Sequence, residues 1–483
     1  MTNTSVAANS QGAGGEVERR ASSGALASLA LSVLLPSLAT SSANVALPTL
    51  ARAFGASFPQ VQWVVLAYLL AVTTLVVSAG RLGDLIGRRR LLLAGVVVFT
   101  AASLLGGAAP GLTALIAARA AQGLGAAAML GLAMAFVGQA VPRARAGSAM
   151  GLLGAMSAVG TTLGPSLGGL LIAELGWRAV FLVNAPLGGL TLLLAWRHLP
   201  VDRRGAREGA GAFDLPGALL LGLALAALAL ATTGGGGRGA TLDATLLGVA
   251  AAGLGLFVLV EARAPSPLIS LALLREPVRW GGLATSAIVS TVMMTTLIVG
   301  PFHLSRALRL GVAEVGVVMS AGPLVAAVAS LPAGRLVDRL GARRTGLAGL
   351  AGLAAGTLAL ASAPLSLGVA GYLAPIALAT CGYALFQTAN NTAVMAEVRP
   401  DERGVLSGAL NLSRNVGLLI GASVMGSVFA LAAGAADVTT AAAEAVAGGT
   451  RTTFAVATAL TVVALAVAAM SGERRSSLAL EPL

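Results

Sequence analysis

The hydropathy pattern divides the chain into long apolar runs separated by short polar segments. An apolar helix needs about 20 residues to cross the hydrocarbon layer of a bilayer. After a polar stretch at residues 1–24, we place fourteen spans at residues 25–47, 61–80, 91–109, 112–141, 149–174, 179–196, 215–232, 244–262, 281–303, 313–333, 345–363, 368–396, 403–432 and 453–471. The pattern predicts an all-α polytopic membrane protein.

The distribution of arginine checks this count independently. Cytoplasmic loops of membrane proteins hold an excess of Lys and Arg. With the N-terminus in the cytoplasm, 23 of the 31 basic residues fall in cytoplasmic segments, six in outer loops and two, Arg119 and Arg414, inside spans. A missed span would reverse this alternation in every later loop. We therefore expect an even number of spans, with both termini cytoplasmic.

Composition excludes several classes of function. Charged residues make up 10% of the chain, against about 25% in soluble domains. All 31 basic residues are arginine, so a Walker A loop and a lysine Schiff base are impossible. One cysteine and two histidines cannot build a Cys/His metal or iron–sulfur site. We expect no enzymatic activity, no cofactor and no metal, and we attribute the net charge of +12 to topology and not to nucleic-acid binding.

Two predicted cytoplasmic loops repeat each other at a constant offset. The loop after the second span reads GRLGDLIGRRR over Gly80–Arg90, and the loop after the tenth reads GRLVDRLGARR over Gly334–Arg344. Glycine, arginine, leucine, aspartate and the closing arginine pair coincide. Internal repeats of this kind mark secondary transporters, with the substrate site between the repeats.

The repeat predicts two bundles of six spans with two extra spans between them. The expected units are a tail at 1–24, an N-terminal bundle at 25–196, a linker with two extra transmembrane helices at 197–278, a C-terminal bundle at 279–472 and a tail at 473–483.

The loop at Gly80–Arg90 resembles the signature loop of the major facilitator superfamily, and the fourteen spans resemble its drug:proton antiporter branch. The stretches that carry the rest of the resemblance are Asn44–Pro48, Arg119–Gly123, Gly164–Gly169, Trp177–Asn184, Phe386–Asn391 and Ser407–Gly417. The resemblance implies efflux of small organic compounds across a bacterial inner membrane in exchange for protons. Its partners would be the substrate, protons and the lipid bilayer; no sequence feature indicates a periplasmic adaptor.

The resemblance makes the repeated loops a gate that latches the bundles on the cytoplasmic side. The gate residues would be Gly80, Asp84, Gly87, Arg88, Arg89, Arg90, Asp338 and Arg343. From the residues alone, Gly83 and Gly87 permit a tight turn, and Asp84 can accept hydrogen bonds at a helix N-terminus or pair with an arginine. A charge cluster that only sets topology explains the three arginines equally well.

Arg119 lies about seven residues into the fourth span. A cation inside a span costs at least about 2.5 kcal/mol. The side chain either snorkels to the outer interface or faces the interior and pairs with a polar group, and Gln122 and Gly123 share its helix face. The resemblance gives Arg119 and Gln122 a role in proton coupling.

Gly160, Gly164 and Gly168 recur every four residues in the fifth span, with Pro165 and Gly169 beside them. Small residues on one helix face allow a close helix crossing. The resemblance identifies the run as the antiporter motif, whose smooth face seals the inner half of the protein against leak. The two interpretations are compatible.

One position departs from the family pattern. The antiporter branch usually has an aspartate five residues before Asn44–Pro48, where this chain has Ala39. Arginine cannot exchange a proton in place of that aspartate, acidic residues fall in loops, tails or span ends, and His303, which can titrate near neutrality, lies at the outer end of the ninth span. A different proton carrier, a proton carried with the substrate and uncoupled transport all stay open.

A substrate cavity between the bundles would be lined by the few polar residues inside spans, about half of which we expect to bond other helices. These residues are Asn44, Gln62, Gln122, Gln139, Tyr383, Gln387, Asn390, Asn391, Asn411 and Arg414. Such a cavity suits moderately hydrophobic compounds, and without a deep carboxylate it favours neutral or anionic ones. The alternatives are an uncoupled or differently coupled metabolite transporter and, more distantly, a receptor or scaffold that transports nothing.

Overall fold

The computed structural model describes residues 4–76, 78–140, 146–202, 214–234, 240–264, 276–396, 403–434 and 438–478. These residues are helical apart from short connections, and none of them forms a strand. Inside a bilayer the polar backbone must satisfy its own hydrogen bonds, which single helices do. The prediction of an all-α protein is confirmed.

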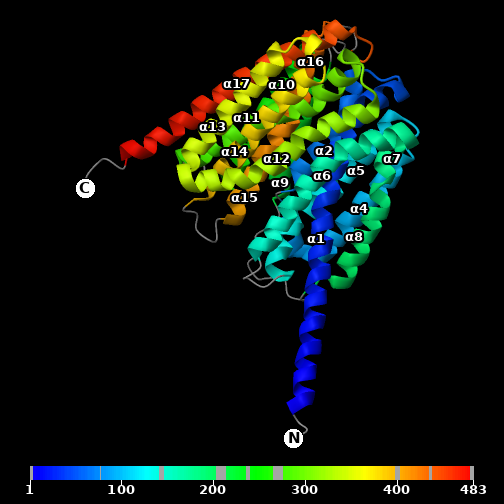
Figure 1. The fold of residues 1–483 in the computed structure, drawn as a ribbon, viewed down its shortest axis with the longest axis vertical. Coiled ribbons are helices and arrows are strands. Elements are labelled where there is room, and N and C mark those ends of the chain that lie inside the picture. The colour runs from blue at the N-terminus through cyan, green and yellow to red at the C-terminus, as the bar shows by residue number, and fades with distance from the viewer. Residues whose placement is uncertain are drawn as a thin grey trace.

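The first half of the chain begins with the long helix α1 (Thr4–Phe54), which Figure 1 shows extending past the other helices towards the N-terminus. Its other helices are α2 (Phe58–Leu75), α3 (Ala79–Ile86), α4 (Arg88–Gly107), α5 (Leu112–Ala140), α6 (Ala146–Leu175), α7 (Arg178–Leu182) and α8 (Asn184–His198). The two extra helices that follow are α9 (Leu215–Thr232) and α10 (Ala240–Glu261).

The second half repeats this arrangement with two short π-helical turns, η3 and η5, and one 3₁₀ turn, η4. Its elements are α11 (Pro277–Phe302), η3 (His303–Ala307), α12 (Val312–Leu340), α13 (Ala342–Ser362), η4 (Leu365–Leu367), α14 (Ala370–Met395), α15 (Arg403–Ile420), η5 (Gly421–Met425), α16 (Gly426–Ala432) and α17 (Ala443–Leu478).

The helices agree with the predicted spans. In the described part of the chain, 13 segments are long and apolar enough to cross a membrane. The predicted span at residues 368–396 corresponds to α14, a helix of 26 residues that is more polar because it carries Gln387 and the pair Asn390–Asn391. Each predicted span therefore overlaps one helix or a run of two or three consecutive helical segments.

The two repeated segments that we predicted as loops are largely helical. The short helix α3 precedes α4, and α12 continues to Leu340 before α13 begins. One glycine breaks the helix in each segment, Gly87 with φ 102° and Gly341 with φ 81°. Positive φ suits glycine because it has no Cβ. The prediction of a turn at Gly83 is wrong, since Gly83 lies inside α3.

Both repeated turns lie at the same end of the helix assembly. Helix α2 runs from Phe58 to the first turn, so we call the two ends the Phe58 end and the turn end. Val312, at the start of α12, lines one cavity with Pro48 and Arg52 from the last residues of α1. Helix α12 thus also starts at the Phe58 end, and its 29 residues lead to the second turn at the turn end.

Two helices join the halves. Helix α6 packs against α1 of its own half and α12 of the other. Helix α9 packs against α2 and α10; Trp63 Nε1 donates a hydrogen bond to Thr233 Oγ1 at 3.1 Å, and Ser427 Oγ of α16 donates one to the Thr232 carbonyl. The linker helix α9 therefore contacts both bundles.

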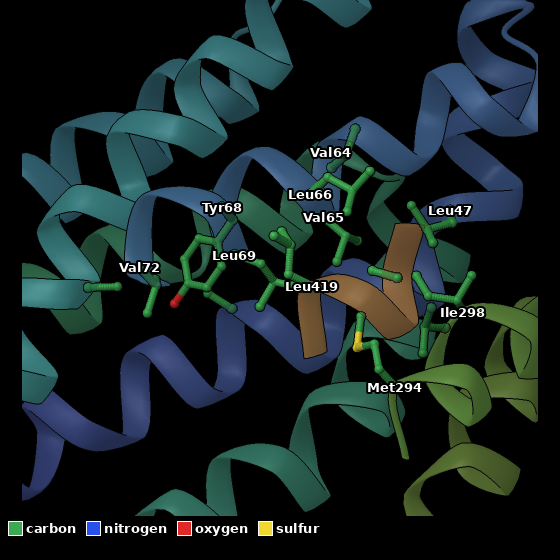
Figure 2. Close-up of a cluster of buried hydrophobic side chains, with 14 of the residues drawn as sticks. Leu47, Val64, Val65, Leu66, Tyr68, Leu69, Val72, Met294, Ile298 and Leu419 are labelled. Atoms are coloured by element: carbon green, nitrogen blue, oxygen red, sulfur yellow. The ribbon is translucent and has the colours of Figure 1, made fainter. Parts of the chain in front are cut away.

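A buried apolar cluster lies where the halves meet. Figure 2 shows α2 side chains such as Val65 and Leu69 near Met294 and Ile298 of α11 and Leu419 of α15. All five are at most 2% exposed. Elsewhere leucines of α10, α12 and α16 are strongly exposed, as expected where a helix faces lipid and not water.

Candidate functional site

Arg119 lies on α5 and is 1% exposed. Its Nε donates a hydrogen bond to the Val64 carbonyl of α2 at 2.9 Å, and its Nη1 donates one to Gln122 Oε1. Gln122 Nε2 donates in turn to Ser103 Oγ of α4 at 2.8 Å. The guanidinium carbon lies 4.2 Å from the centroid of the Tyr68 ring. Three helices of the N-terminal bundle thus hold the cation.

This environment decides between the two interpretations of Arg119. The side chain does not snorkel, because it is buried among polar groups of its own bundle. The salt bridges given for the described residues are Arg88–Asp84 and Arg279–Glu276, so neither includes Arg119. Its Nη2 atom is buried and has no hydrogen-bond partner among the described residues. Arg119 is a buried cation compensated by neutral groups.

Asp84, the acidic residue of the first turn, pairs with an arginine. Arg88 Nε donates to Asp84 Oδ1 at 2.8 Å across the Gly87 break between α3 and α4, and the side chains of Arg88 and Asp84 are 24% and 44% exposed. The equivalent acid of the second turn, Asp338, is exposed, and Ala342 occupies the position that corresponds to Arg88. The repeat therefore preserves the acid but not its partner.

Asp202, which follows α8, caps the first turn from outside the repeated segment. Its carboxylate accepts hydrogen bonds from the backbone N–H groups of Arg89 and Arg90 at 3.0 and 3.2 Å. Negative charge at a helix N-terminus is stabilising because the free N–H groups there carry partial positive charge. Sequence reasoning missed this residue, since it lies more than 100 positions from its partners.

Arg89 and Arg343, which are equivalent in the two turns, each contact the last helix of their own bundle. Arg89 Nη2 donates to the Trp196 carbonyl of α8. Arg343 Nη2 donates to the Ala469 carbonyl of α17 at 3.3 Å. These bonds, and the Asp84 ion pair, all stay within one bundle. Helix α3, which contains Gly80, packs against α4 and α5 of its own half.

The glycine stripe of α6 faces α1. Ser41 Oγ donates to the Gly160 carbonyl at 3.1 Å. A Cβ added at Gly164 would overlap Ser41 Oγ, and one at Gly168 would lie 3.0 Å from Ser42 Cβ. The three glycines thus share a face, as the spacing predicts, and their face packs inside the N-terminal bundle.

A second face of α6 packs against α12 of the other bundle. A Cβ added at Gly169 would lie 3.1 Å from Gly316 Cα, and one at Gly316 would overlap the Pro165 carbonyl. The backbone N–H of Ser166 donates to Ser320 Oγ at 3.0 Å. These residues lie in the half of α6 nearer the Phe58 end, whereas we expected the seal in the half nearer the arginine-bearing turns.

The polar residues predicted to line a cavity in the N-terminal bundle are buried. Gln62 is 1% exposed, and its Nε2 donates to the Ala422 carbonyl of η5, so it joins the two bundles. Asn44 is fully buried, and neither side-chain polar atom has a hydrogen-bond partner among the described residues. Gln122 belongs to the Arg119 network, and the Gln139 side chain lies outside the described residues.

The C-terminal bundle holds the more accessible polar group. Five half-buried side chains of α14 and α15 are Tyr383, Gln387, Asn391, Asn411 and Arg414. Gln387 Nε2 lies 3.5 Å from Asn391 Oδ1, and Gln387 Oε1 and Arg414 Nε have no hydrogen-bond partner among the described residues. Asn390 instead is 8% exposed and donates through Nδ2 to the Gly282 carbonyl of α11 at 3.0 Å.

Three buried phenylalanines that sequence reasoning did not single out join the bundles at the Phe58 end. Phe58 of α2 packs against Phe302 of α11 and Phe429 of α16, with ring centroids 5.0 and 5.6 Å away. Near-perpendicular ring pairs of this kind add to the stability that burial already gives. Their spacing along the chain carries no periodic signal that would predict the contact.

Residues 29–422 match the family described as the Major Facilitator Superfamily. The chain belongs to this superfamily. It is therefore a multi-pass membrane transporter and not an enzyme.

Proteins similar to this facilitator are named for drug resistance or transport. It is 36% identical over 390 residues to the multidrug resistance protein Stp of Mycobacterium tuberculosis (strain CDC 1551 / Oshkosh), covering 80% of this chain and 72% of that protein. It is 30% identical over 408 residues to the riboflavin transporter RibZ of Clostridioides difficile (strain 630), covering 83% and 87%.

The fold of this facilitator is also found in solved structures. A bacterial homologue of the human lysosomal transporter Spinster, in an inward-facing and unoccupied conformation, superposes with a TM-score of 0.69. The match covers 94% of this chain and 97% of that one at 16% sequence identity. The likeness supports the two-bundle fold.

Proposed function

We propose that this facilitator exports small, moderately hydrophobic organic compounds by alternating access, in exchange for protons. The observation that carries the proposal is the 36% identity over 390 residues with a protein named for multidrug resistance. Apolar sites with a few polar groups suit such compounds, and the half-buried amides of α14 and α15 would supply those groups.

In this proposal the turn end lies in the cytoplasm and both termini are cytoplasmic. The excess of arginine in the predicted inner segments supports that orientation. The contacts of Phe58 with Phe302 and Phe429, and of Gln62 with the Ala422 carbonyl, all join the bundles at the Phe58 end. They are consistent with a state closed towards the outside.

The turns with Asp84 and Asp338 would latch the bundles in the opposite state. The Asp84–Arg88 ion pair, the bond from Arg89 to the Trp196 carbonyl and the bond from Arg343 to the Ala469 carbonyl each stay within one bundle. A latch that joins the two bundles would have only such bonds within one bundle when it is released. The two-fold repeat supports a joint role, because each bundle contributes one turn to the same end.

Arg119 and Gln122 would take part in proton coupling. Arginine keeps its charge at every accessible pH, so it cannot carry the proton itself. A fixed cation favours the deprotonated form of any acidic group that approaches it. The buried and unpartnered Nη2 of Arg119 supports this role, with the proton carried by another group or with the substrate.

The expected substrates are neutral or anionic. Arg414 Nε and Gln387 Oε1 are polar atoms without hydrogen-bond partners among the described residues of the C-terminal bundle, and they could bind a polar group of a bound compound. Asn44 and Asn391 would contribute amides, whereas the bonds of Gln62 and Asn390 to backbone carbonyls suggest that these two amides stabilise helix packing.

Purified protein in liposomes tests the proposal. We expect an imposed pH gradient to drive accumulation of apolar neutral or anionic compounds from a panel matched in size, and an ionophore that collapses the gradient to abolish it. Transport that continues after collapse would contradict proton exchange. Efficient transport of lipophilic cations alone would contradict the substrate class.

A metabolite transporter is the second candidate, and the similarity to the riboflavin transporter RibZ favours it. Riboflavin added to the same panel distinguishes the two. Saturable riboflavin uptake that is independent of the gradient, without transport of the other compounds, would favour this alternative.

A further inference from the structure

We propose that Tyr68 is the positioning residue of Arg119, and that the face of its ring balances the buried charge of the guanidinium. The inference rests on the proposed role of Arg119 in coupling and names a residue which that role needs. None of the family-resembling motifs includes Tyr68.

The first argument is the charge balance around Arg119. A buried cation needs compensation, because desolvation removes its favourable interaction with water. The neutral Val64 carbonyl and Gln122 amide accept two of its hydrogen bonds, and neither described salt bridge reaches it. An aromatic face attracts a cation within about 6 Å of the ring centroid, and the Tyr68 ring lies 4.2 Å from the guanidinium carbon.

The second argument is that Tyr68 is itself held in place. It is 2% exposed, and its hydroxyl donates to the Pro36 carbonyl of α1 at 3.2 Å. Thr40 Oγ1 donates to the same carbonyl at 2.8 Å. On the other side, Gly123 of α5 approaches the Tyr68 backbone so closely that a Cβ would lie 2.5 Å from its carbonyl. The ring therefore has a fixed place between α1 and α5.

This arrangement explains how the guanidinium of Arg119 can be held in place and still donate a further hydrogen bond. Figure 2 shows Tyr68 on α2 next to Leu69 and Val72, within the buried cluster. Contact with the ring uses the face of the guanidinium, so its edge can still donate hydrogen bonds: Nε and Nη1 bind Val64 and Gln122, and Nη2 has no partner among the described residues. A movement of α1 or α2 that displaced Tyr68 would thus change the position of Arg119.

Transport by three Tyr68 variants tests the inference in proteoliposomes. Tyr68→Phe and Tyr68→Trp keep an aromatic face, and we expect them to retain transport within about threefold of the wild type. Tyr68→Leu removes the face, and we expect at least about a tenfold loss of maximal rate with little change in KM. Phe136→Leu, at a residue of α5 that is 1% exposed, is the matched control for loss of a buried ring and should transport normally.

Wild-type rates in Tyr68→Leu, or equal losses in Tyr68→Leu and Tyr68→Phe, would overturn the inference. A double-mutant cycle on thermal unfolding separates it from the proposed function. We expect Tyr68→Leu to lower the unfolding temperature in the Arg119 protein and to lower it much less in Arg119→Leu. Additive effects of the two substitutions on the unfolding temperature would contradict charge balance by the ring. Non-additive effects, together with no transport by the wild-type protein, would contradict only the proposed function.

Discussion

The two repeated turns share a sequence but not their electrostatic surroundings. Each breaks its helix at a single glycine of positive φ, and in each an equivalent arginine, Arg89 or Arg343, donates to a carbonyl of the last helix in its bundle. The first turn also has an ion pair between Asp84 and Arg88 and a cap from Asp202.

This difference indicates which features the turn needs locally and which are particular to one bundle. The glycine break and the arginine–carbonyl bond occur in both turns, so we attribute them to the geometry that the two turns share. The ion pair and the cap depend on Arg88 and Asp202, and Ala342 replaces the former in the second turn. We infer that the first turn is the more strongly organised half of the proposed latch.

Asp84→Asn should have the largest effect on transport. A solvent-exposed ion pair contributes at most about 1 kcal/mol to stability, so folding and membrane insertion should be nearly unchanged. If the latch depends on this acid, transport should fall about tenfold or more, as measured by uptake into vesicles with matched amounts of protein. Asp338→Asn is the control and should lose less; equal losses would remove the distinction between the turns, and wild-type transport by Asp84→Asn would contradict the latch.

Alanine substitution of the two glycines should destabilise the protein more at the first turn than at the second. Alanine at a positive φ costs about 1–2 kcal/mol, so both Gly87→Ala and Gly341→Ala should lower the unfolding temperature. A Cβ at Gly87 would also overlap the Asp202 carboxylate, whereas nothing lies within 4 Å of one at Gly341. Thermal unfolding in detergent should therefore show the larger decrease for Gly87→Ala, and the reverse order would contradict the described cap.

Loss of the cap should have a smaller effect. Asp202→Ala removes the acceptor for the first N–H groups of α4 and should cost about 1 kcal/mol. Hydrogen exchange should accelerate at Arg89 and Arg90 and stay unchanged around Arg343, which serves as the internal control. Unchanged protection of the two N–H groups would show that Asp202 does not cap α4 in the membrane.

The smallest effects should come from the shared arginine–carbonyl bonds. Arg89→Gln and Arg343→Gln each remove the partly exposed hydrogen bond to the last helix, which lies at the weak end of the usual range, about 0.5 kcal/mol. Because the contact is the same in both bundles, the two variants should lower the unfolding temperature by similar small amounts. A large difference between the two decreases in unfolding temperature would mean that the arginine–carbonyl bond stabilises one turn more than the other.

The fold could be predicted to a large extent. Apolar length and the placement of arginine predict the spans, and the repeated segments predict two related halves with a turn at Gly87. The prediction was wrong at Gly83, because the close packing of Gly83 against Leu132 of α5 and Arg88 of α4 accommodates a helical turn there, and α3 continues to Ile86. The sequence also did not predict the contact of α6 with α12, since a glycine stripe reveals that a helix packs closely but not against which neighbour.

The candidate site was predicted less well. Sequence reasoning singled out Arg119 and Gln122 and expected them on one face, which their hydrogen bond bears out. It could not supply Tyr68, Asp202 or the contact between Phe58 and Phe429, because these residues carry no motif of their own and meet partners far away along the chain.

The sequence by itself determined the helical membrane architecture, because the length of an apolar run, the positive charge beside it and the conformational freedom of a glycine act locally. Only the tertiary structure decided how the buried cation is compensated, which face of α6 meets which bundle and which residues join the bundles at the Phe58 end. Those features depend on pairs such as Arg119 with Val64, 55 residues apart, and Gln62 with Ala422, 360 apart. The periodicity of the sequence cannot predict such pairs, since only the packing of the helices brings them together.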